Sequence, residues 1–205
     1  MKRDLIIKVL TLLVITSLLI FLFRGSEYML LISAAILIHE TGHIVTAKAE
    51  GVRFTRGNGI FGGFSLKFDF SSVSYLKEVT VAVAGAAFNV IACILTLLLN
   101  KSPGVHSVFF IFSNLSLAIF NLIPVSPLDG AGILRALLSM ISGPYTAEII
   151  AAGVSAVFSF AFFILCTYIQ LKVGINLSLM FVSLVLLYNT LKSTKLIQKQ
   201  KNRES

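Results

Sequence analysis

Charged side chains are scarce in this sequence of 205 residues: 13% are Asp, Glu, Lys or Arg, whereas 57% are hydrophobic. Soluble domains average about 25% charged residues, so the shortage excludes an ordinary soluble domain and predicts an integral, multi-pass protein of the cell membrane. Tryptophan is absent, and there are 2 cysteines. Because Cys93 and Cys166 lie far apart in separate apolar runs, we expect two buried thiols rather than a disulfide or metal ligands.

Acidic residues are the scarcer charges, with 9 Asp and Glu against 17 Lys and Arg and a net charge of +8. In a soluble protein this excess could suggest a nucleic-acid partner. Here the basic residues lie at the ends of apolar runs, as in the N-terminal Lys2, Arg3 and Lys8 and the tail over residues 192–205. Since cytoplasmic loops are enriched in Lys and Arg, the pattern predicts that both termini are cytoplasmic, with the lipid bilayer and no nucleic acid as partner.

Long apolar runs occupy most of the chain, and a membrane-spanning helix needs about 20 such residues. We expect an α-helical polytopic membrane protein with about six transmembrane helices, over residues 5–23, 28–49, 75–99, 106–123, 146–169 and 174–188. The first run is expected to be a retained span, because no small-x-small cleavage pattern follows it. We predict a single transmembrane domain over residues 1–191 and a basic cytoplasmic tail over residues 192–205.

The segment over residues 52–70 differs from the spans, because glycines punctuate it and polar residues alternate with apolar ones. Residues 64–70 alternate with period two, which predicts a strand. Residues 52–55 could pair with it across the turn at residues 57–59. We therefore expect a small membrane-edge β-sheet, whose edge could hold an extended peptide by strand addition.

Two histidines and a glutamate interrupt the second apolar run, where residues 39–43 read His-Glu-Thr-Gly-His. His39 and His43 are four positions apart, so on a helix they share one face and could bind one Zn²⁺ per chain, with Glu40 as the general base. A charged residue at the centre of a bilayer costs about 2.5–3.5 kcal/mol on insertion scales. Such a cluster is therefore expected only where a metal, a water-filled cavity or mutual contacts satisfy it; interior hydrogen bonding without a metal is the alternative.

A catalytic zinc ion usually takes a third protein ligand, and the candidates are Asp129, Glu148 and His106. Under the predicted topology His106 lies on the opposite side of the membrane, and Glu148 begins a span with no unusual backbone. Asp129 follows a segment broken by Pro124 and Pro127, on the same side as the histidines. We expect Asp129 to be the ligand; its alternative role is turn formation before a glycine. A short helix is expected to follow over residues 133–141.

Three motifs in this order resemble the site-2 protease family of intramembrane zinc metalloproteases. They are the histidine motif, Gly85-x-x-x-Asn89 on the next span, and residues 121–130, which read Asn-Leu-Ile-Pro-Val-Ser-Pro-Leu-Asp-Gly. The resemblance covers residues 28–135 and implies zinc held by His39, His43 and Asp129, with Glu40 as base. It also implies that Asn89 contacts the substrate or stabilises the oxyanion, although bonding to a neighbouring helix is the alternative; Asn121 could cap broken backbone.

The compact chain is most similar to the sporulation-type subgroup, whose members cleave a membrane-tethered sigma-factor precursor. Ala131-Gly132 departs from the family pattern, in which a second glycine and an arginine are common at this point. The resemblance implies a membrane-protein substrate and leaves room for a regulatory membrane protein. With both termini cytoplasmic, the second span runs from outside to inside, so we expect the active site toward the cytoplasmic half of the membrane. Two alternatives remain: a metal-binding transporter, and an inactive relative that binds membrane clients.

Overall fold

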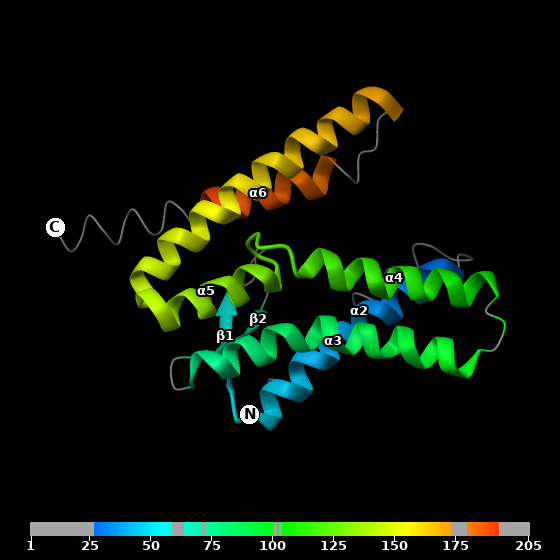
Figure 1. Ribbon diagram of the computed structural model, residues 1–205, viewed down its shortest axis with the longest axis horizontal. Helices are drawn as coiled ribbons and strands as arrows, with labels where there is room; N and C mark the ends of the chain where they lie inside the picture. The colour runs from blue at the N-terminus through cyan, green and yellow to red at the C-terminus, as the bar shows by residue number, and fades with distance from the viewer. Residues whose placement is uncertain are drawn as a thin grey trace. The chain divides into compact units, whose positions relative to one another are not determined.

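The computed structural model describes most of the chain between the two terminal segments (Figure 1). The described ranges are residues 27–58, 64–70, 73–100, 102, 104–173 and 180–192. The chain divides into two compact units, Met1–Phe120 and Asn121–Ser205. Each unit is described below by itself.

The first unit contains three long helices, α2 (Glu27–Ala49), α3 (Tyr75–Leu99) and α4 (Val105–Asn121), whose last residue belongs to the second unit. The predicted bounds of α2 and α3 are confirmed to within one residue, whereas α4 ends two residues before the predicted position. Helices α3 and α4 lie side by side (Figure 1), and the Asn89 amide donates to the carbonyl of Asn114 at 3.3 Å. Helix α2 packs against α3, and this pair carries the histidine motif.

Close packing of α2 on α3 depends on Gly42, which lies inside the histidine motif. A Cβ at this position would lie 2.6 Å from the backbone oxygen of Ala84 and 2.9 Å from Cγ of Phe88. Both distances are well inside van der Waals contact, so a larger residue would separate the helices. Helix α2 could not otherwise bring its histidines against the backbone of α3.

Helix α2 ends in a Schellman motif. Gly51 has φ of 70° and donates to the carbonyl of Lys48, while Val52 donates to the carbonyl of Ala47 at 2.9 Å. Val52 then packs with Ala47 and Val81 in a buried apolar cluster. The turn therefore fixes the end of α2 against α3, about two helical turns away from His43.

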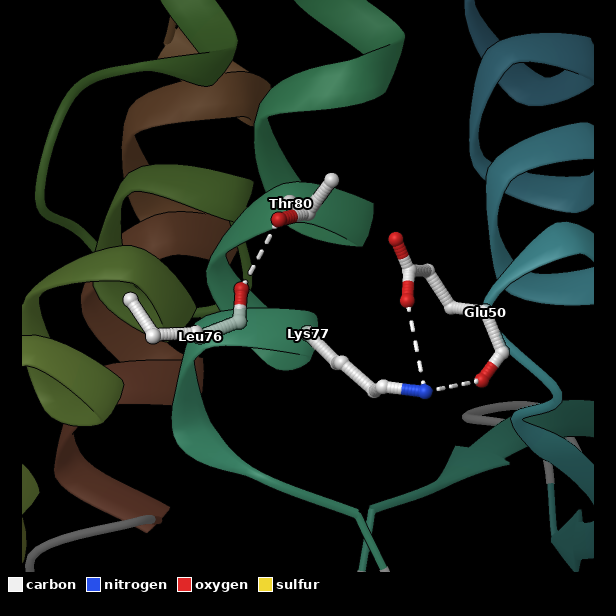
Figure 2. Close-up of polar contacts among 4 residues, drawn as sticks. All are labelled: Glu50, Leu76, Lys77 and Thr80. Atoms are coloured by element: carbon white, nitrogen blue, oxygen red, sulfur yellow. Dashed lines mark hydrogen bonds and ion pairs between the residues drawn. The ribbon is translucent and has the colours of Figure 1, made fainter.

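Lys77 makes a second connection between the end of α2 and the start of α3 (Figure 2). Its ammonium donates to the backbone oxygen of Glu50 at 2.9 Å and lies 3.4 Å from the Glu50 carboxylate. One turn further along α3, the hydroxyl of Thr80 donates to the carbonyl of Leu76 at 2.9 Å. Since the Lys77 and Glu50 side chains are partly exposed, this ion pair is worth at most about 1 kcal/mol and serves mainly to orient the two ends.

Between α2 and α3 the backbone forms a two-stranded antiparallel sheet. Strand β1 (Arg53–Asn58) pairs with β2 (Phe64–Asp69), with Arg53 opposite Asp69 and Asn58 opposite Phe64. Phe70 and Val73, which follow β2, pack against the apolar cluster at the end of α2. The sheet is thus attached to the end of the α2–α3 pair; its place at the membrane edge stays a prediction.

The second unit consists of α5 (Asp129–Ser142), α6 (Pro144–Val173) and a shorter apolar helix over Met180–Lys192. Gly143, with φ of 80°, makes the turn between α5 and α6, and the two helices pack together. The hydroxyls of Ser159 and Thr190 lie 2.8 Å apart and connect α6 to the last helix. The prediction that the helix after the prolines begins at residue 133 is wrong, because it begins at Asp129. The last turn of the broken segment, in which Leu128 donates to the carbonyl of Val125, ends at residue 128.

Three described helices are long and apolar enough to cross a membrane: Glu27–Ala49, Tyr75–Leu99 and Pro144–Lys172. At most a third of each apolar stretch is buried within the structure, as expected of helices that face lipid. The fold is therefore that of an α-helical polytopic membrane protein. The helices over Val105–Asn121 and Met180–Lys192 are shorter, so the described residues do not reach the predicted count of six spans. The predicted first span lies outside the described residues.

Candidate metal centre

The two histidines of the motif lie together on the face of α2 that packs against α3. His39 and His43 are each 5% exposed, and their Nε2 atoms are 3.1 Å apart. Two nitrogens bound to one tetrahedral zinc ion at 2.0–2.1 Å would lie about 3.3–3.4 Å apart. The observed separation therefore requires only a few tenths of an ångström of adjustment to accept a shared metal ion.

His43 is oriented by a backbone atom of α3. Its Nδ1 lies 2.7 Å from the carbonyl oxygen of Val81. A carbonyl oxygen can only accept, so Nδ1 carries the proton and the lone pair of the neutral ring is on Nε2. This is the tautomer that a metal ligand needs, and metal-binding histidines usually donate their second ring N–H in this way.

Gly85, one turn after Val81 on α3, leaves space beside both imidazole rings. A Cβ at this position would collide with Nε2 of His43 and would lie 2.7 Å from Cε1 of His39. No other residue type avoids that overlap, because every other residue has a Cβ. Helix α3 therefore supplies the Val81 carbonyl as an acceptor for His43, and one turn later Gly85 leaves room for the two imidazoles and an ion bound between them.

Glu40 follows His39 on α2 and is half-buried. Asp129 is the first residue of α5 in the second unit and is also half-buried. Its position at a helix N-terminus stabilises a carboxylate, because the unpaired N–H groups of the first turn carry partial positive charge. Next to it, a Cβ at Gly130 would collide with the backbone oxygens of Leu122 and Ile123, so α5 begins in close contact with the segment before it.

Both rejected candidates for the third ligand have partners of their own. His106 lies 2.6 Å from the carboxylate of Glu27, in the first turn of α2. Twelve residues of helix separate Glu27 from His39, which is about 18 Å, so His106 lies far from the histidine pair. Glu148 lies 3.9 Å from Nε of Arg135, within the second unit.

Asn89 is fully buried one turn beyond Gly85, and its amide nitrogen donates to the carbonyl of Asn114 on α4. The Oδ1 atoms of Asn89 and Asn114 have no hydrogen-bond partner among the described residues. The bond to α4 is the second of the two roles expected for Asn89. Asn121, which could cap broken backbone, is the last residue of α4.

The defining pattern of Peptidase family M50 matches residues 27–107 and 100–166 of the chain. The chain belongs to peptidase family M50. The match includes both histidines, Glu40, Asn89 and Asp129, and it confirms the resemblance to the site-2 proteases. The narrower assignment of this M50 chain to the sporulation-type subgroup stays a prediction.

Two curated relatives of this M50 chain are zinc metalloproteases by name. One, from Synechocystis sp., is 32% identical over 131 residues, which cover 60% of this chain and 34% of the relative. The other, from Methanocaldococcus jannaschii, is 30% identical over 134 residues, which cover 61% of this chain and 38% of the relative. The M50 chain thus matches little more than a third of the length of either relative.

The fold of this M50 chain is also that of a solved structure, the site-2 protease from Methanocaldococcus jannaschii. The TM-score is 0.58 at 24% sequence identity, over 90% of this chain and 86% of that one. At this identity the likeness shows the fold.

Sequence reasoning missed the backbone carbonyl of Val81 and the contact of Gly85 with the histidines. Residue type does not reveal a backbone acceptor, and the Gly85-x-x-x-Asn89 motif assigns no role to Gly85 itself. The spacing of four residues between Gly85 and Asn89 places both on one face of α3, and this is the face that Gly85 presents to the histidines. It does not tell which of the two residues lies at the metal centre.

Proposed function

We propose that this chain is an intramembrane zinc endopeptidase, which hydrolyses a peptide bond in or near the transmembrane segment of a membrane-tethered protein. The observation that carries the proposal is the buried pair of His39 and His43 on a helix of membrane-spanning length, with Nε2 atoms 3.1 Å apart. Membership of peptidase family M50 and the names of the curated relatives support the same chemistry.

The proposed metal ligands are His39, His43 and Asp129, holding one Zn²⁺ per chain. Two imidazoles and one carboxylate form a common ligand set for catalytic zinc, which keeps a fourth position for water or substrate. When bound, zinc supplies a Lewis acid that activates water and polarises the peptide carbonyl. The fixed Nδ1–H tautomer of His43 suits this role, since its Nε2 lone pair needs no rearrangement.

Glu40 is the proposed general base. Its place directly after a ligand histidine allows its carboxylate to take a proton from the attacking water and then to protonate the leaving amine. For Asn89 we propose the connection to α4 as its main role, because its amide already donates to Asn114. Oxyanion stabilisation by Asn89 remains the competing proposal, and the two are separated by a test given in the Discussion.

Substrate presentation is proposed to use the sheet formed by β1 and β2. A transmembrane helix hides its carbonyls in internal hydrogen bonds, so a client must unwind locally before it can be cut. An edge strand at the membrane surface can hold such an extended segment through backbone hydrogen bonds. The proposal also includes six spans with cytoplasmic termini and a catalytic centre toward the cytoplasmic half of the membrane. It further includes a sigma-factor precursor as client and a regulatory membrane protein.

The test is to co-express the chain with a panel of single-span client proteins and to compare wild type with Glu40→Gln. We expect Glu40→Gln to lose cleavage and retain zinc, because the amide cannot take up a proton. The matched control is Glu27→Gln, the same change on the same helix about 20 Å away, which should retain both. Cleavage that survives Glu40→Gln contradicts the mechanism.

The same comparison, together with a zinc-uptake assay in vesicles that contain the chain, separates the two other candidate functions. A metal transporter would show zinc uptake across vesicles and no cleavage by wild type. An inactive relative would bind clients without cutting them, so wild type and Glu40→Gln would behave alike.

A further inference from the structure

The segment that leads into Asp129 is irregular backbone within a membrane protein. Residues 122–128 have no regular secondary structure, and such backbone is tolerated at membrane depth only where its polar groups are satisfied by protein or water. Pro124 and Pro127 have no N–H. Of the other N–H groups in residues 124–128, Val125 donates to Ile123 at 2.8 Å and Leu128 donates to Val125 at 2.7 Å.

The N–H that remains, that of Ser126, finds its acceptor on another helix. It donates to the hydroxyl of Ser155 on α6 at 3.3 Å, and the same hydroxyl donates to the carbonyl of Pro124 at 3.2 Å. A serine hydroxyl can donate and accept at once. Ser155 is 2% exposed, so bulk water cannot replace it, and its contacts lie three and five residues before Asp129.

We propose that Ser155 is a positioning residue for Asp129. This inference rests on the proposed function, in which Asp129 binds zinc. The hydroxyl holds the two polar groups that the segment cannot satisfy by itself, and the segment in turn packs against the first turn of α5 at Gly130. The backbone before Asp129 is therefore held from α5 on one side and from α6 on the other.

Removal of the hydroxyl leaves the Ser126 N–H and the Pro124 carbonyl without this partner in a partly buried place. The segment must then change its path to satisfy them, and Asp129 moves with it. Metal sites need their ligands within about 0.5 Å of the productive geometry. Loss of an outer-shell partner typically weakens metal binding by about 10–100-fold.

The test compares Ser155→Ala with Ser159→Ala in the purified full-length chain. Ser159 lies one turn further along α6, is fully buried and bonds the Thr190 hydroxyl instead of the segment. Each variant loses a buried serine hydroxyl. We expect Ser155→Ala to raise the zinc Kd by about tenfold or more, while Ser159→Ala keeps the wild-type Kd and Ser155→Thr, which retains the hydroxyl, restores it.

The Co²⁺-substituted chain gives a second readout, because its visible absorption reports the geometry of the ligands. We expect the spectrum to change in Ser155→Ala and to stay the same in Ser159→Ala. A wild-type Kd and spectrum in Ser155→Ala, with only a lower unfolding temperature, would show a purely structural role and overturn the inference.

If Ser155→Ala does not fold, Ser155→Cys replaces it, since the thiol has similar size and is a weaker hydrogen-bonding group. Weaker zinc binding by Ser155→Cys than by Ser155→Thr supports the inference, and equal binding contradicts it. A wild-type chain that binds no zinc would refute the proposed function as well. Zinc binding by wild type with no effect of the Ser155 variants would refute the positioning role alone.

Discussion

Gly85→Ala adds a single methyl group at the point where α3 meets the two imidazoles. The new Cβ would lie 2.7 Å from the Cε1 atoms of His39 and His43, whereas carbon atoms in contact are normally about 3.5–4.0 Å apart. The rings must therefore move by about 0.8–1.3 Å, or α3 must move away from α2. Misplacement of about 1 Å can lower a catalytic rate by about 100-fold.

The effect of Gly85→Ala on stability should be small by comparison. Replacing glycine by alanine inside a helix contributes about 1 kcal/mol of stability, whereas overpacking costs about 1–3 kcal/mol. The net loss is then at most about 2 kcal/mol, by the difference of these two ranges. We expect a chain that still folds, binds zinc at least about tenfold more weakly and cleaves its client at least about 100-fold more slowly.

Gly153→Ala is the matched control, because Gly153 lies within α6 and a Cβ there would have nothing within 4 Å. It should keep wild-type zinc binding and cleavage. Zinc affinity is measured by competition with a fluorescent chelator, and unfolding by heating in detergent. Wild-type zinc affinity and cleavage in Gly85→Ala would refute the steric reasoning, as would an equal loss in Gly153→Ala.

Two further substitutions test the other proposed site residues. Asp129→Ala removes a proposed ligand, so it should weaken zinc binding by more than about 100-fold, the upper end of the effect of losing a residue that only supports a ligand. Zinc binding is measured by chelator competition, and Glu148→Ala is the control. Weaker zinc binding in Glu148→Ala, with no change in Asp129→Ala, would transfer the ligand role to Glu148. Asn89→Ala should lower the free energy of unfolding by about 1 kcal/mol and leave kcat nearly unchanged. A fall in kcat of about 100–1000-fold in single-turnover cleavage would instead assign Asn89 to the oxyanion.

The fold of the first unit could be predicted because its signals are strong and local. Apolar runs of membrane length gave α2 and α3 almost to the residue. The start of α5 could not be predicted in the same way, because Gly130 and Gly132 resemble a continued break. In the structure the absence of a Cβ at Gly130 permits a close approach to Leu122 and Ile123, and the helix begins there.

In the candidate site, too, the features set by local sequence could be predicted and those set by long-range contacts could not. His39 and His43 could be paired from sequence, since four positions on a helix determine a shared face. The partners that orient the site come from distant parts of the chain: Val81 for His43, and Ser155 for the segment before Asp129. Such contacts depend on how helices pack, which no local pattern encodes.

The carbonyl of Val81 has a consequence for how the metal centre tolerates sequence change. An outer-shell partner that is a side chain is lost when its residue is replaced. A backbone oxygen is present whatever residue occupies position 81, so that position can vary among apolar residues that fill the cluster with Ala47 and Val52. In homologous chains we therefore expect the tautomer of His43 to persist while residue 81 drifts, and a variable position there would not argue against a metal centre.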